Sequence, residues 1–422
     1  YQKEIESQPD PTDPRLAPPS TPPIVVNPPP ERTDDDKVLL PDGQRISVLD
    51  LTEKLLKSLP QENLSYLGLV YKNCLKGLTC VASLMETFGI QEKDEAVKFG
   101  QLLQQKKILH HVTNDHEFSD SSYFYRLQPF QTPTILNSYR IWSDRIDQDH
   151  MALVTRLAKM MGKITSDATD GDGNVDYIKA SENENYPAFE EAVCEIQGVS
   201  MINMDDKMKI AFGINLYNLM IKYAFIKVGI PSSNFQRQKF FGKTIFYIGG
   251  DEYSFNDLEN GILRGNSKAP YALQAPFSSY DPRMKLMVKN VDPRIHFGLN
   301  CGAKSCPPVK KFTVVAIEEE LRIVASAFAE QDENVLVDED SNELHLTSIL
   351  SWFRADFAES KDKLPEAILN FLKGEKKEKL EKMIKNKKKS IKITFMTYDW
   401  GTDASKSKMY NIGKLKSKKL SA

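Results

Sequence analysis

The segment DPRIHFGLNCGAKSCPP, from Asp292 to Pro308, gathers more reactive side chains than any other window of this 422-residue chain. Prolines near both of its ends predict a turn-rich segment rather than a helix or strand. Its reactive groups are one imidazole, two thiols, one amide and two cations: His296, Cys301, Cys306, Asn300, Arg294 and Lys304. We therefore expect any chemistry of this protein to centre here.

Length, charge and cysteine content favour an intracellular protein of two domains. A chain of 422 residues exceeds the usual size of a single domain. Its 56 Lys and Arg residues nearly balance its 58 Asp and Glu residues, so the charge of the whole chain does not favour nucleic acid as a partner. Five scattered cysteines do not form the pattern of a secreted disulfide framework. We expect a cytoplasmic protein that meets membranes, if at all, from their surface.

The most apolar window, Ile210 to Ile230, is predicted to be a buried helix. It is long enough to cross a bilayer, but Lys222 and Lys227 lie within it, and charges inside a span are costly. No hydrophobic leader opens the sequence, and its first residue is Tyr1 rather than Met. We therefore expect a piece of a longer protein.

The chain begins with residues 1–37, which are rich in proline and acidic side chains. Such a segment buries too little apolar surface to offset its ordering entropy, which predicts a disordered linker. A docking site for a proline-binding domain is the alternative.

Residues 38–128 predict a compact domain of three helices and a hairpin. Apolar spacing predicts helices over 47–59, after Gly77 and from about Lys93, and strands over 108–112 and 123–127. His110 and His111 are adjacent, so in a strand they point to opposite faces and cannot share a metal. We expect structural roles for both, and no metal or cofactor.

This region resembles a DEP domain through five segments in order: Tyr71–Gly77, Glu95–Leu103, His110–Val112, His116–Asp120 and Tyr123–Leu127. The resemblance implies a small winged-helix-like domain that is recruited to membranes or to receptor and G-protein signalling complexes. Four lysines would then face anionic headgroups, at about 1 kcal/mol for each well-placed cation. They are Lys72, Lys76, Lys106 and Lys107, and a merely solvated surface is the alternative.

The rest of the chain predicts a connecting helix over 129–153, a larger α+β domain over 154–403 and a basic tail over 404–422. The connecting helix is the first part of a long amphipathic helix expected over 130–162. Further helices are expected over 208–228, 314–331 and 373–392, and strands over 240–248 and 391–398. The fold class of the whole chain is therefore α+β.

Three arginines are candidates for binding an anion. Arg283 and Arg294 each end an Asp-Pro-Arg triplet, so each follows a predicted turn, and Arg264 is the third. Salt bridges within the protein are the alternative.

The larger domain resembles the family known as domain of unknown function 547. The matching segments are Ile214–Asn218, Gly261–Arg264, His296–Pro308 and Tyr398–Trp400. The resemblance implies no settled activity. A DEP domain often precedes such a domain, and a glutaredoxin-like domain sometimes stands before both.

Two hypotheses of function follow. In the first, the DEP module localises a second domain that binds a partner or ligand. In the second, a thiolate of Cys301 or Cys306 attacks an amide, ester or thioester while His296 carries the proton. Another polar group would orient the imidazole: Asn215, Asn218, Asn300 or Asp399. Zinc binding, a disulfide and plain structural packing of the thiols are the alternatives, and zinc would lack a fourth ligand.

Overall fold

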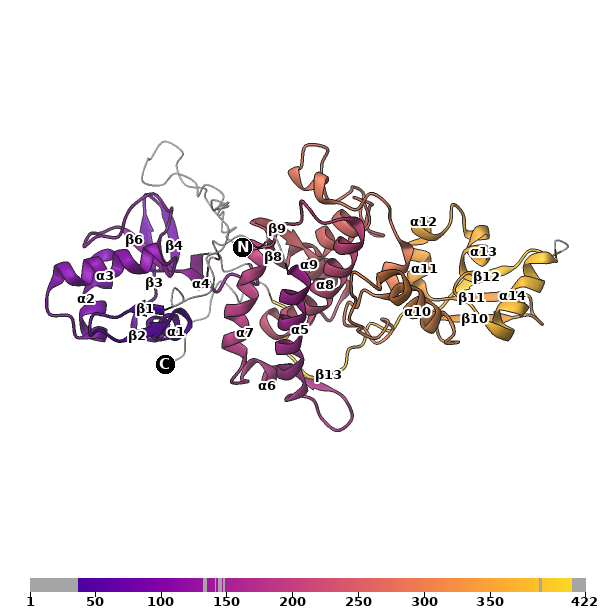
Figure 1. The fold of residues 1–422 in the computed structure, drawn as a ribbon, viewed down its shortest axis with the longest axis horizontal. Helices are drawn as coiled ribbons and strands as arrows, with labels where there is room; N and C mark the ends of the chain where they lie inside the picture. The colour runs from indigo at the N-terminus through magenta and orange to yellow at the C-terminus, as the bar shows by residue number, and fades with distance from the viewer. Residues whose placement is uncertain are drawn as a thin grey trace.

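The computed structural model describes residues 37–131, 135–140, 142, 146, 149–386 and 389–411. Along its longest axis the chain forms an N-terminal domain, a central helical part and a C-terminal part in that order (Figure 1). Helices and strands are both present throughout, which confirms the α+β class. The linker over 1–37, apart from Lys37, and the lysines after residue 411 lie outside the described residues.

The N-terminal domain packs helices against a four-stranded antiparallel sheet whose order is β3-β4-β6-β5. The strands of this sheet are β3 (Glu62–Tyr66), β4 (Leu69–Lys76), β5 (Leu109–His111) and β6 (Phe124–Leu127). The helices are α1 (Val48–Ser58), α2 (Gly77–Phe88), α3 (Lys93–Gln105) and the short α4 (Gln128–Gln131). A separate hairpin joins β1 (Lys37–Leu39) to β2 (Arg45–Ser47).

Local signals explain where these helices begin and end. The Ser47 hydroxyl accepts from the Asp50 amide at the start of α1, and Gly89 ends α2 in the left-handed conformation. The three helices and the β5–β6 hairpin confirm the sequence prediction. The β3–β4 hairpin was not predicted, because its first strand is polar and lacks an alternating apolar pattern.

The expected helix over 130–162 is wrong in its first half. Helix α4 ends at Gln131, and α5 (His150–Ser166) begins nineteen positions later. Between them Ile135 forms a parallel bridge to Ile245. The Asn137 side chain also exchanges two hydrogen bonds with the backbone of Tyr247, at 2.8 and 3.0 Å. Tertiary pairing therefore overrides the helical pattern at these positions.

The central part is organised around α8 (Asp206–Val228), which is buried along almost its whole length. No helix among the described residues is long and apolar enough to cross a membrane. Around α8 lie α5, α6 (Tyr177–Ser181), α7 (Tyr186–Ala192), η2 (Val193–Gly198), α9 (Asn234–Lys243), and the hairpin of β8 (Ile245–Ile248) and β9 (Asp251–Ser254). The sequence predicts a strand over 240–248, but its first residues belong to α9, which buries Phe240. Only Ile245–Ile248 form a strand, β8.

Three short helical segments follow in the central part: η3 (Asp257–Leu263), η4 (Pro282–Leu286) and η5 (Pro293–Phe297). The first is a π-helix, a form that frequently marks functional sites. The last opens the reactive segment.

The C-terminal part has its own apolar core and a three-stranded sheet of order β10-β11-β12. Its strands are β10 (Val335–Asp338), β11 (Glu343–Leu346) and β12 (Lys392–Phe395). Its helices are α10 (Ile317–Ala329), α11 (Ser348–Trp352), α12 (Arg354–Phe357), η6 (Lys361–Lys363), α13 (Leu364–Leu369) and α14 (Gly374–Lys385).

The chain then returns to the central part. Strand β13 (Ala404–Lys406) pairs in parallel with β7 (Val175–Asp176), and Tyr410 is buried against the central core. The sequence predicts a tail from residue 404, but the chain packs against the central part as far as residue 411. Its backbone bonds to β7 and to the end of α8, and the Tyr410 side chain is buried.

Candidate functional site

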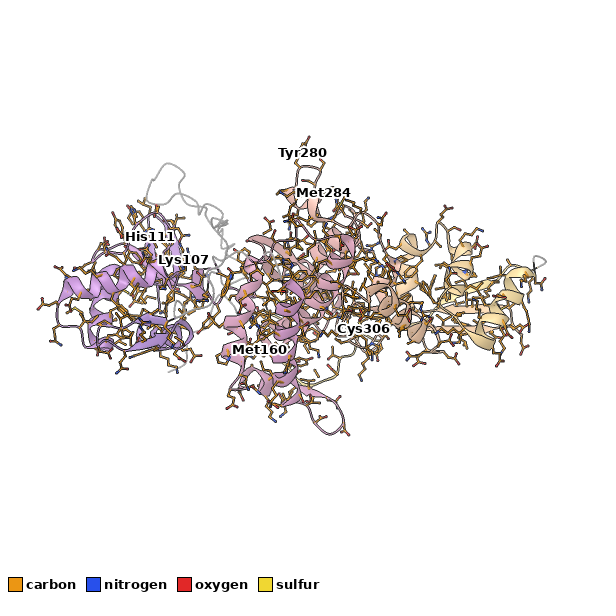
Figure 2. All side chains as sticks on the ribbon, in the orientation of Figure 1. Lys107, His111, Met160, Tyr280, Met284 and Cys306 are labelled. Carbon is orange, nitrogen blue, oxygen red and sulfur yellow. The ribbon has the colours of Figure 1, made fainter. Side chains whose placement is uncertain are left out.

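A cavity of about 410 Å³ lies where the central and C-terminal parts meet. Figure 2 places Cys306 in this boundary region, well away from Lys107 in the N-terminal domain. Seven aromatic residues lie in the cavity wall: Tyr217, Phe241, Tyr271, Trp352, Phe353, Tyr398 and Trp400. The polar groups that reach it include Arg237, Asn256, Glu259, Asn260, His296, Cys301 and Cys306.

Helix α8 holds the reactive segment and the residues just after it through two asparagine side chains. Asn218 donates to the Gly298 carbonyl at 2.9 Å and accepts from the Asn300 amide at 2.8 Å. Asn215 donates to the Phe312 carbonyl at 2.7 Å and accepts from the Phe312 amide at 3.0 Å. Each amide thus holds the backbone as a neighbouring strand would, and neither orients the imidazole of His296.

Asn300 folds the segment back on itself. Its side chain donates to the Pro307 carbonyl at 2.7 Å and accepts from the Gly302 amide at 2.7 Å. Gly302 has a φ of 86°, and a Cβ there would lie 2.5 Å from the ring of Phe225. Only glycine fits this bend, which brings Cys301 and Cys306 together.

The two thiols lie against each other at the cavity wall. Their sulfurs are 3.0 Å apart, and Cys306 Sγ also accepts from the Cys301 amide at 3.1 Å and from the Tyr398 hydroxyl at 3.1 Å. The Cys301 thiol across this contact, followed by the Tyr398 hydroxyl and the Cys301 amide, favours the charged sulfur and lowers the pKa of Cys306 to about 7. The same contact and burial raise the pKa of Cys301. Cys306 is therefore the more acidic thiol of the pair.

His296 is held on another side of the cavity by Asp356. Its Nε2 donates to Asp356 Oδ2 at 2.7 Å, and its ring stacks on Phe353 with centroids 3.9 Å apart. Arg264 forms a bidentate pair with the same carboxylate, at 2.5 and 2.7 Å. Burial lowers the pKa of His296. Burial raises the pKa of Asp356, but the hydrogen bonds from His296 and Arg264 outweigh it and lower that pKa to about 2. The imidazole is thus neutral at neutral pH, with Nδ1 as its accepting nitrogen.

The π-helix η3 supplies a buried carboxyl group. Glu259 accepts from the Tyr217 hydroxyl at 3.1 Å, and burial raises the pKa of Glu259. Asn260, the next residue, accepts from Arg264 at 2.6 Å. The cavity therefore combines an acidic thiol, an imidazole and a carboxyl group within mostly apolar walls, and a small-molecule site typically has such walls with a few polar groups.

The structure brings some of the predicted site residues together and separates others. Cys301, Cys306 and His296 share the cavity, but no hydrogen bond among the described residues joins the imidazole to either sulfur. Asp399 is exposed and accepts from the Gly401 amide at 2.8 Å, so it stabilises a turn outside the cavity.

The three arginines have carboxylate partners within the protein. Arg264 binds Asp356, Arg283 binds Asp281, and Arg294 binds Asp292 and Glu318. These pairs favour the alternative of internal salt bridges over anion binding.

Sequence reasoning missed Asp356, Glu259 and the role of Tyr398. Asp356 meets His296 across 60 positions of sequence, and no local pattern predicts such a pair. A signal for Tyr398 was present, since Tyr398–Trp400 is one of the segments that carry the family resemblance.

In the N-terminal domain the four predicted lysines form two pairs. Lys72 and Lys76 are exposed on β4, whereas Lys106 and Lys107 are half-buried where α3 ends. The hairpin turn before Lys72 also exposes two apolar side chains, Leu67 and Val70, at 65% and 59% of their surface.

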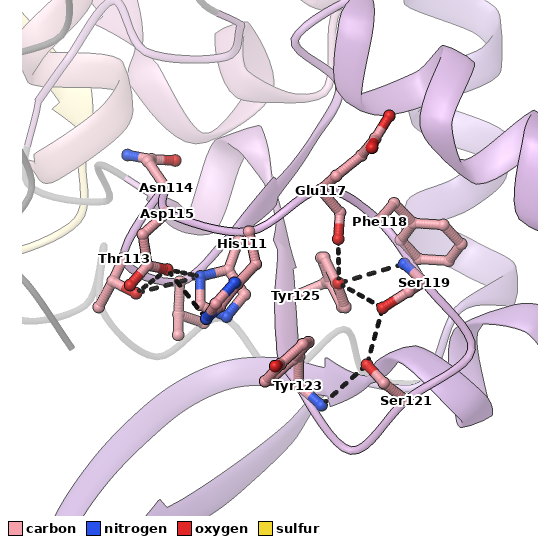
Figure 3. Close-up of polar contacts among 12 residues, drawn as sticks. His111, Thr113, Asn114, Asp115, Glu117, Phe118, Ser119, Ser121, Tyr123 and Tyr125 are labelled. Atoms are coloured by element: carbon pink, nitrogen blue, oxygen red, sulfur yellow. Dashed lines mark hydrogen bonds and ion pairs between the residues drawn. The ribbon is translucent and has the colours of Figure 1, made fainter. Parts of the chain in front are cut away.

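His110 and His111 each have a polar partner within the domain. His110 Nε2 lies 3.1 Å from the Lys107 carbonyl, and His111 Nδ1 lies 2.6 Å from Asp115 and 3.0 Å from Thr113 (Figure 3). One metal-ligating set arises among the described residues, formed by His111, Asp115 and His116 with ligand atoms within 4.8 Å of one another. Within this set His111 and Asp115 bond directly, whereas Asp115 Oδ2 and His116 Nε2 are buried without a hydrogen-bond partner among the described residues.

Comparison with known families agrees with this architecture. Residues 58–127 match the domain found in Dishevelled, Egl-10, and Pleckstrin (DEP), and residues 201–329 match the protein family of unknown function DUF547. The chain therefore carries a DEP domain followed by a DUF547 region, and both sequence resemblances are confirmed.

Similar proteins include two fungal vacuolar membrane-associated proteins. The protein iml1 of Schizosaccharomyces pombe is 34% identical over 79 residues, which are 18% of this chain and 5% of that protein. IML1 of Eremothecium gossypii is 44% identical over 62 residues, 14% of this chain and 4% of that protein. The chain thus spans about a twentieth of the length of these relatives.

Proposed function

We propose that this chain is a membrane-recruited signalling protein in which the DEP domain docks on an anionic membrane and the DUF547 region binds a small ligand. Recruitment is supported by the DEP match and by the membrane association that the names of the Iml1 relatives record. Ligand binding is supported above all by the aromatic cavity with its converging polar groups.

The β3–β4 hairpin is the part of the DEP domain that best fits a membrane surface. Leu67 and Val70 are exposed at its turn, and Val70 and Lys72 point to the same side of β4. Apolar side chains that enter the headgroup region next to lysines combine the two attractions that hold peripheral proteins. Lys76, at the other end of β4, adds a further cation.

Vesicle sedimentation tests the recruitment. Vesicles that contain phosphatidylserine should bind the protein, and Lys72→Glu with Lys76→Glu should weaken binding by roughly tenfold or more, at about 1 kcal/mol per cation. The matched control is Lys159→Glu with Lys179→Glu, two exposed lysines of the central part. Equal binding by both double variants and the wild type would reject the hairpin as the docking surface.

The ligand cavity fits a small organic molecule with a flat apolar body and a polar end. Trp352 and Trp400 stack at 5.6 Å between centroids, with Tyr398 beside both, and Glu259 brings a carboxyl group to the cavity wall. A library of such molecules, screened by tryptophan fluorescence, should yield ligands that Trp352→Ala no longer binds. Ligands that bind this variant as tightly as the wild type would place the site elsewhere.

A cysteine-dependent hydrolase is the second candidate, and the lowered pKa of Cys306 favours it. Because Tyr398 and Cys301 already stabilise the thiolate, His296 is not needed to take its proton. His296, whose Nδ1 is the accepting nitrogen, would instead take a proton from the water that attacks the acyl group left on Cys306 by an amide, ester or thioester.

Acyl transfer separates this candidate from plain ligand binding. A hydrolase should turn over a simple thioester through an acyl group on Cys306, visible by mass spectrometry. His296→Ala should then slow turnover by roughly 100-fold while thiol labelling of Cys306 persists. A stable acyl group that never leaves, or none at all, would exclude hydrolysis and leave ligand binding.

A further inference from the structure

Cys301 and Cys306 offer more than either function proposed above requires. Hydrolysis needs a single nucleophile and ligand binding needs none, yet the reactive segment places two thiols 3.0 Å apart at the cavity wall. The bend at Gly302 and the hydrogen bonds of Asn300 hold this arrangement.

The two sulfurs have unequal surroundings. Cys306 Sγ accepts from the Cys301 amide, from the Tyr398 hydroxyl and from the Cys301 thiol. Cys301 Sγ lies farther from Tyr398, at 3.6 Å. Negative charge therefore collects on Cys306, and the pKa of its thiol falls to about 7 while that of Cys301 rises. Cys306 is the nucleophile and Cys301 keeps its proton.

A disulfide lies within reach of this pair. Its bond length is about 2.05 Å, so the sulfurs need to approach by only about 1 Å. The four residues between the two cysteines fold back on themselves, with the Cys306 amide donating to the Ala303 carbonyl at 3.0 Å.

We propose that Cys301 and Cys306 form a peroxide-reactive dithiol, in which Cys306 is oxidised first and Cys301 then closes a disulfide in the cavity wall. The proposal rests on neither function proposed above, although it concerns the same cavity, and the oxidant is hydrogen peroxide or an organic hydroperoxide.

The chemistry balances in two steps. In the first, Cys306 thiolate attacks one oxygen of hydrogen peroxide, the O–O bond breaks, and the departing hydroxide takes up a proton as water, which leaves a sulfenic acid. In the second, the sulfur of Cys301 attacks the sulfur of Cys306, the S–O bond breaks, and the departing hydroxide leaves with the thiol proton as a second water. The two sulfurs lose two electrons, which the peroxide gains.

The other cysteines lack this reactivity. Cys74, Cys80 and Cys194 are buried, and burial raises the pKa of Cys80 and of Cys194 to about 12. Oxidation by one equivalent of peroxide should therefore select the cavity pair. The disulfide would remove the charge that Tyr398 faces, so it would also change what the cavity binds.

Peptide mapping of the wild-type chain tests the disulfide directly. The chain is treated with one equivalent of hydrogen peroxide at neutral pH, blocked with N-ethylmaleimide and digested with trypsin. Because Lys304 lies between the two cysteines, digestion yields the peptides Ile295–Lys304 and Ser305–Lys310, which stay joined only through a disulfide. We expect the joined pair, with free thiols falling from five to three. Separate peptides that both carry the blocking group would overturn the proposal.

Two variants assign the order of events. In Cys301→Ser, oxidation should stop at a sulfenic acid on Cys306 that dimedone traps, whereas Cys306→Ser should consume peroxide more slowly by roughly tenfold or more. Cys194→Ser is the matched control and should behave as the wild type. Dimedone capture at Cys301 in Cys306→Ser, at the wild-type rate, would contradict the assignment. Circular dichroism checks the fold of each variant. If one variant fails to fold, the peptide mapping of the wild-type chain still tests the disulfide.

Discussion

The imidazole of His296 and the carboxylate of Asp356 meet at 2.7 Å from two different parts of the chain. The same carboxylate also holds the buried guanidinium of Arg264. Asp356 on α12 therefore connects the C-terminal part to Arg264, at the end of η3, and to the reactive segment. The contact uses Nε2 of His296, so Nδ1 is the ring nitrogen outside it. Its loss should affect both stability and the geometry of the cavity.

Replacing Asp356 should destabilise the protein strongly. Asp356→Ala leaves the buried Arg264 without its partner, which typically costs about 3–5 kcal/mol. Urea denaturation followed by the fluorescence of Trp352 and Trp400 measures the change. The exposed Asp362→Ala is the control and should shift stability by less than about 0.5 kcal/mol. Equal midpoints for the two variants would contradict the role assigned to Asp356.

Asn218 should prove structural rather than catalytic. Asn218→Asp keeps the acceptor for the Asn300 amide but turns an oxygen toward the Gly298 carbonyl, at a cost of at least about 2 kcal/mol. Hydrogen exchange in the peptide Ile295–Lys304 should accelerate, because the segment loses its clamp. The exposed Asn234→Ala should leave that exchange unchanged. Unaltered exchange in Asn218→Asp would show that other contacts hold the segment.

Two helical glycines should respond in opposite ways to alanine. In Gly100→Ala, the new Cβ would lie 2.1 Å from the ring of the buried Phe118, and overpacking should cost roughly 1–3 kcal/mol. In Gly162→Ala nothing lies within 4 Å of the new Cβ, so the higher helix propensity of alanine should stabilise by about 0.5–1 kcal/mol. Thermal unfolding measures both, and a stabilised Gly100→Ala would refute the close packing of α3.

Acid should weaken the DEP domain through His110. Burial lowers the pKa of His110 from 6.5 to about 4, so between these values the unfolded chain binds a proton that the folded chain does not. The free energy of unfolding is therefore unaffected by the titration of His110 above pH 6.5. It decreases as the pH falls toward 4, by up to roughly 3 kcal/mol. Hydrogen exchange of β5 should report the loss, and His110→Gln should show less of it. Parallel losses in both proteins would contradict this source of acid sensitivity.

Much of the fold is visible in the sequence because local signals decide it. Helices α1, α2, α3 and α8 follow their apolar spacing, and the Ser47 cap and Gly89 mark two of their ends. The segment before α5 has a helical pattern too, but Asn137 there binds the backbone of Tyr247 instead. Partners 110 positions apart cannot be predicted from spacing.

The local part of the candidate site could be predicted from the sequence, and the part that depends on distant residues could not. The cluster of Cys301, Cys306 and His296 is local, so it stands out in the sequence. Which sulfur carries the charge depends on Tyr398, more than 90 positions away. The asparagines of α8 looked like orienting groups because of their amides, and only the fold reveals that these bind backbone.

The pH dependence of alkylation at each cysteine tests most directly whether Cys306 is the reactive thiolate of the cavity. With iodoacetamide, Cys306 should react first, with a midpoint near pH 7, while Cys194 stays slow because burial raises its pKa to about 12. Tyr398→Phe should move the midpoint upward, since the thiolate loses a donor. First labelling of Cys301, or a Cys306 midpoint at the ordinary thiol value of about 8.5 in the wild type, would contradict the account.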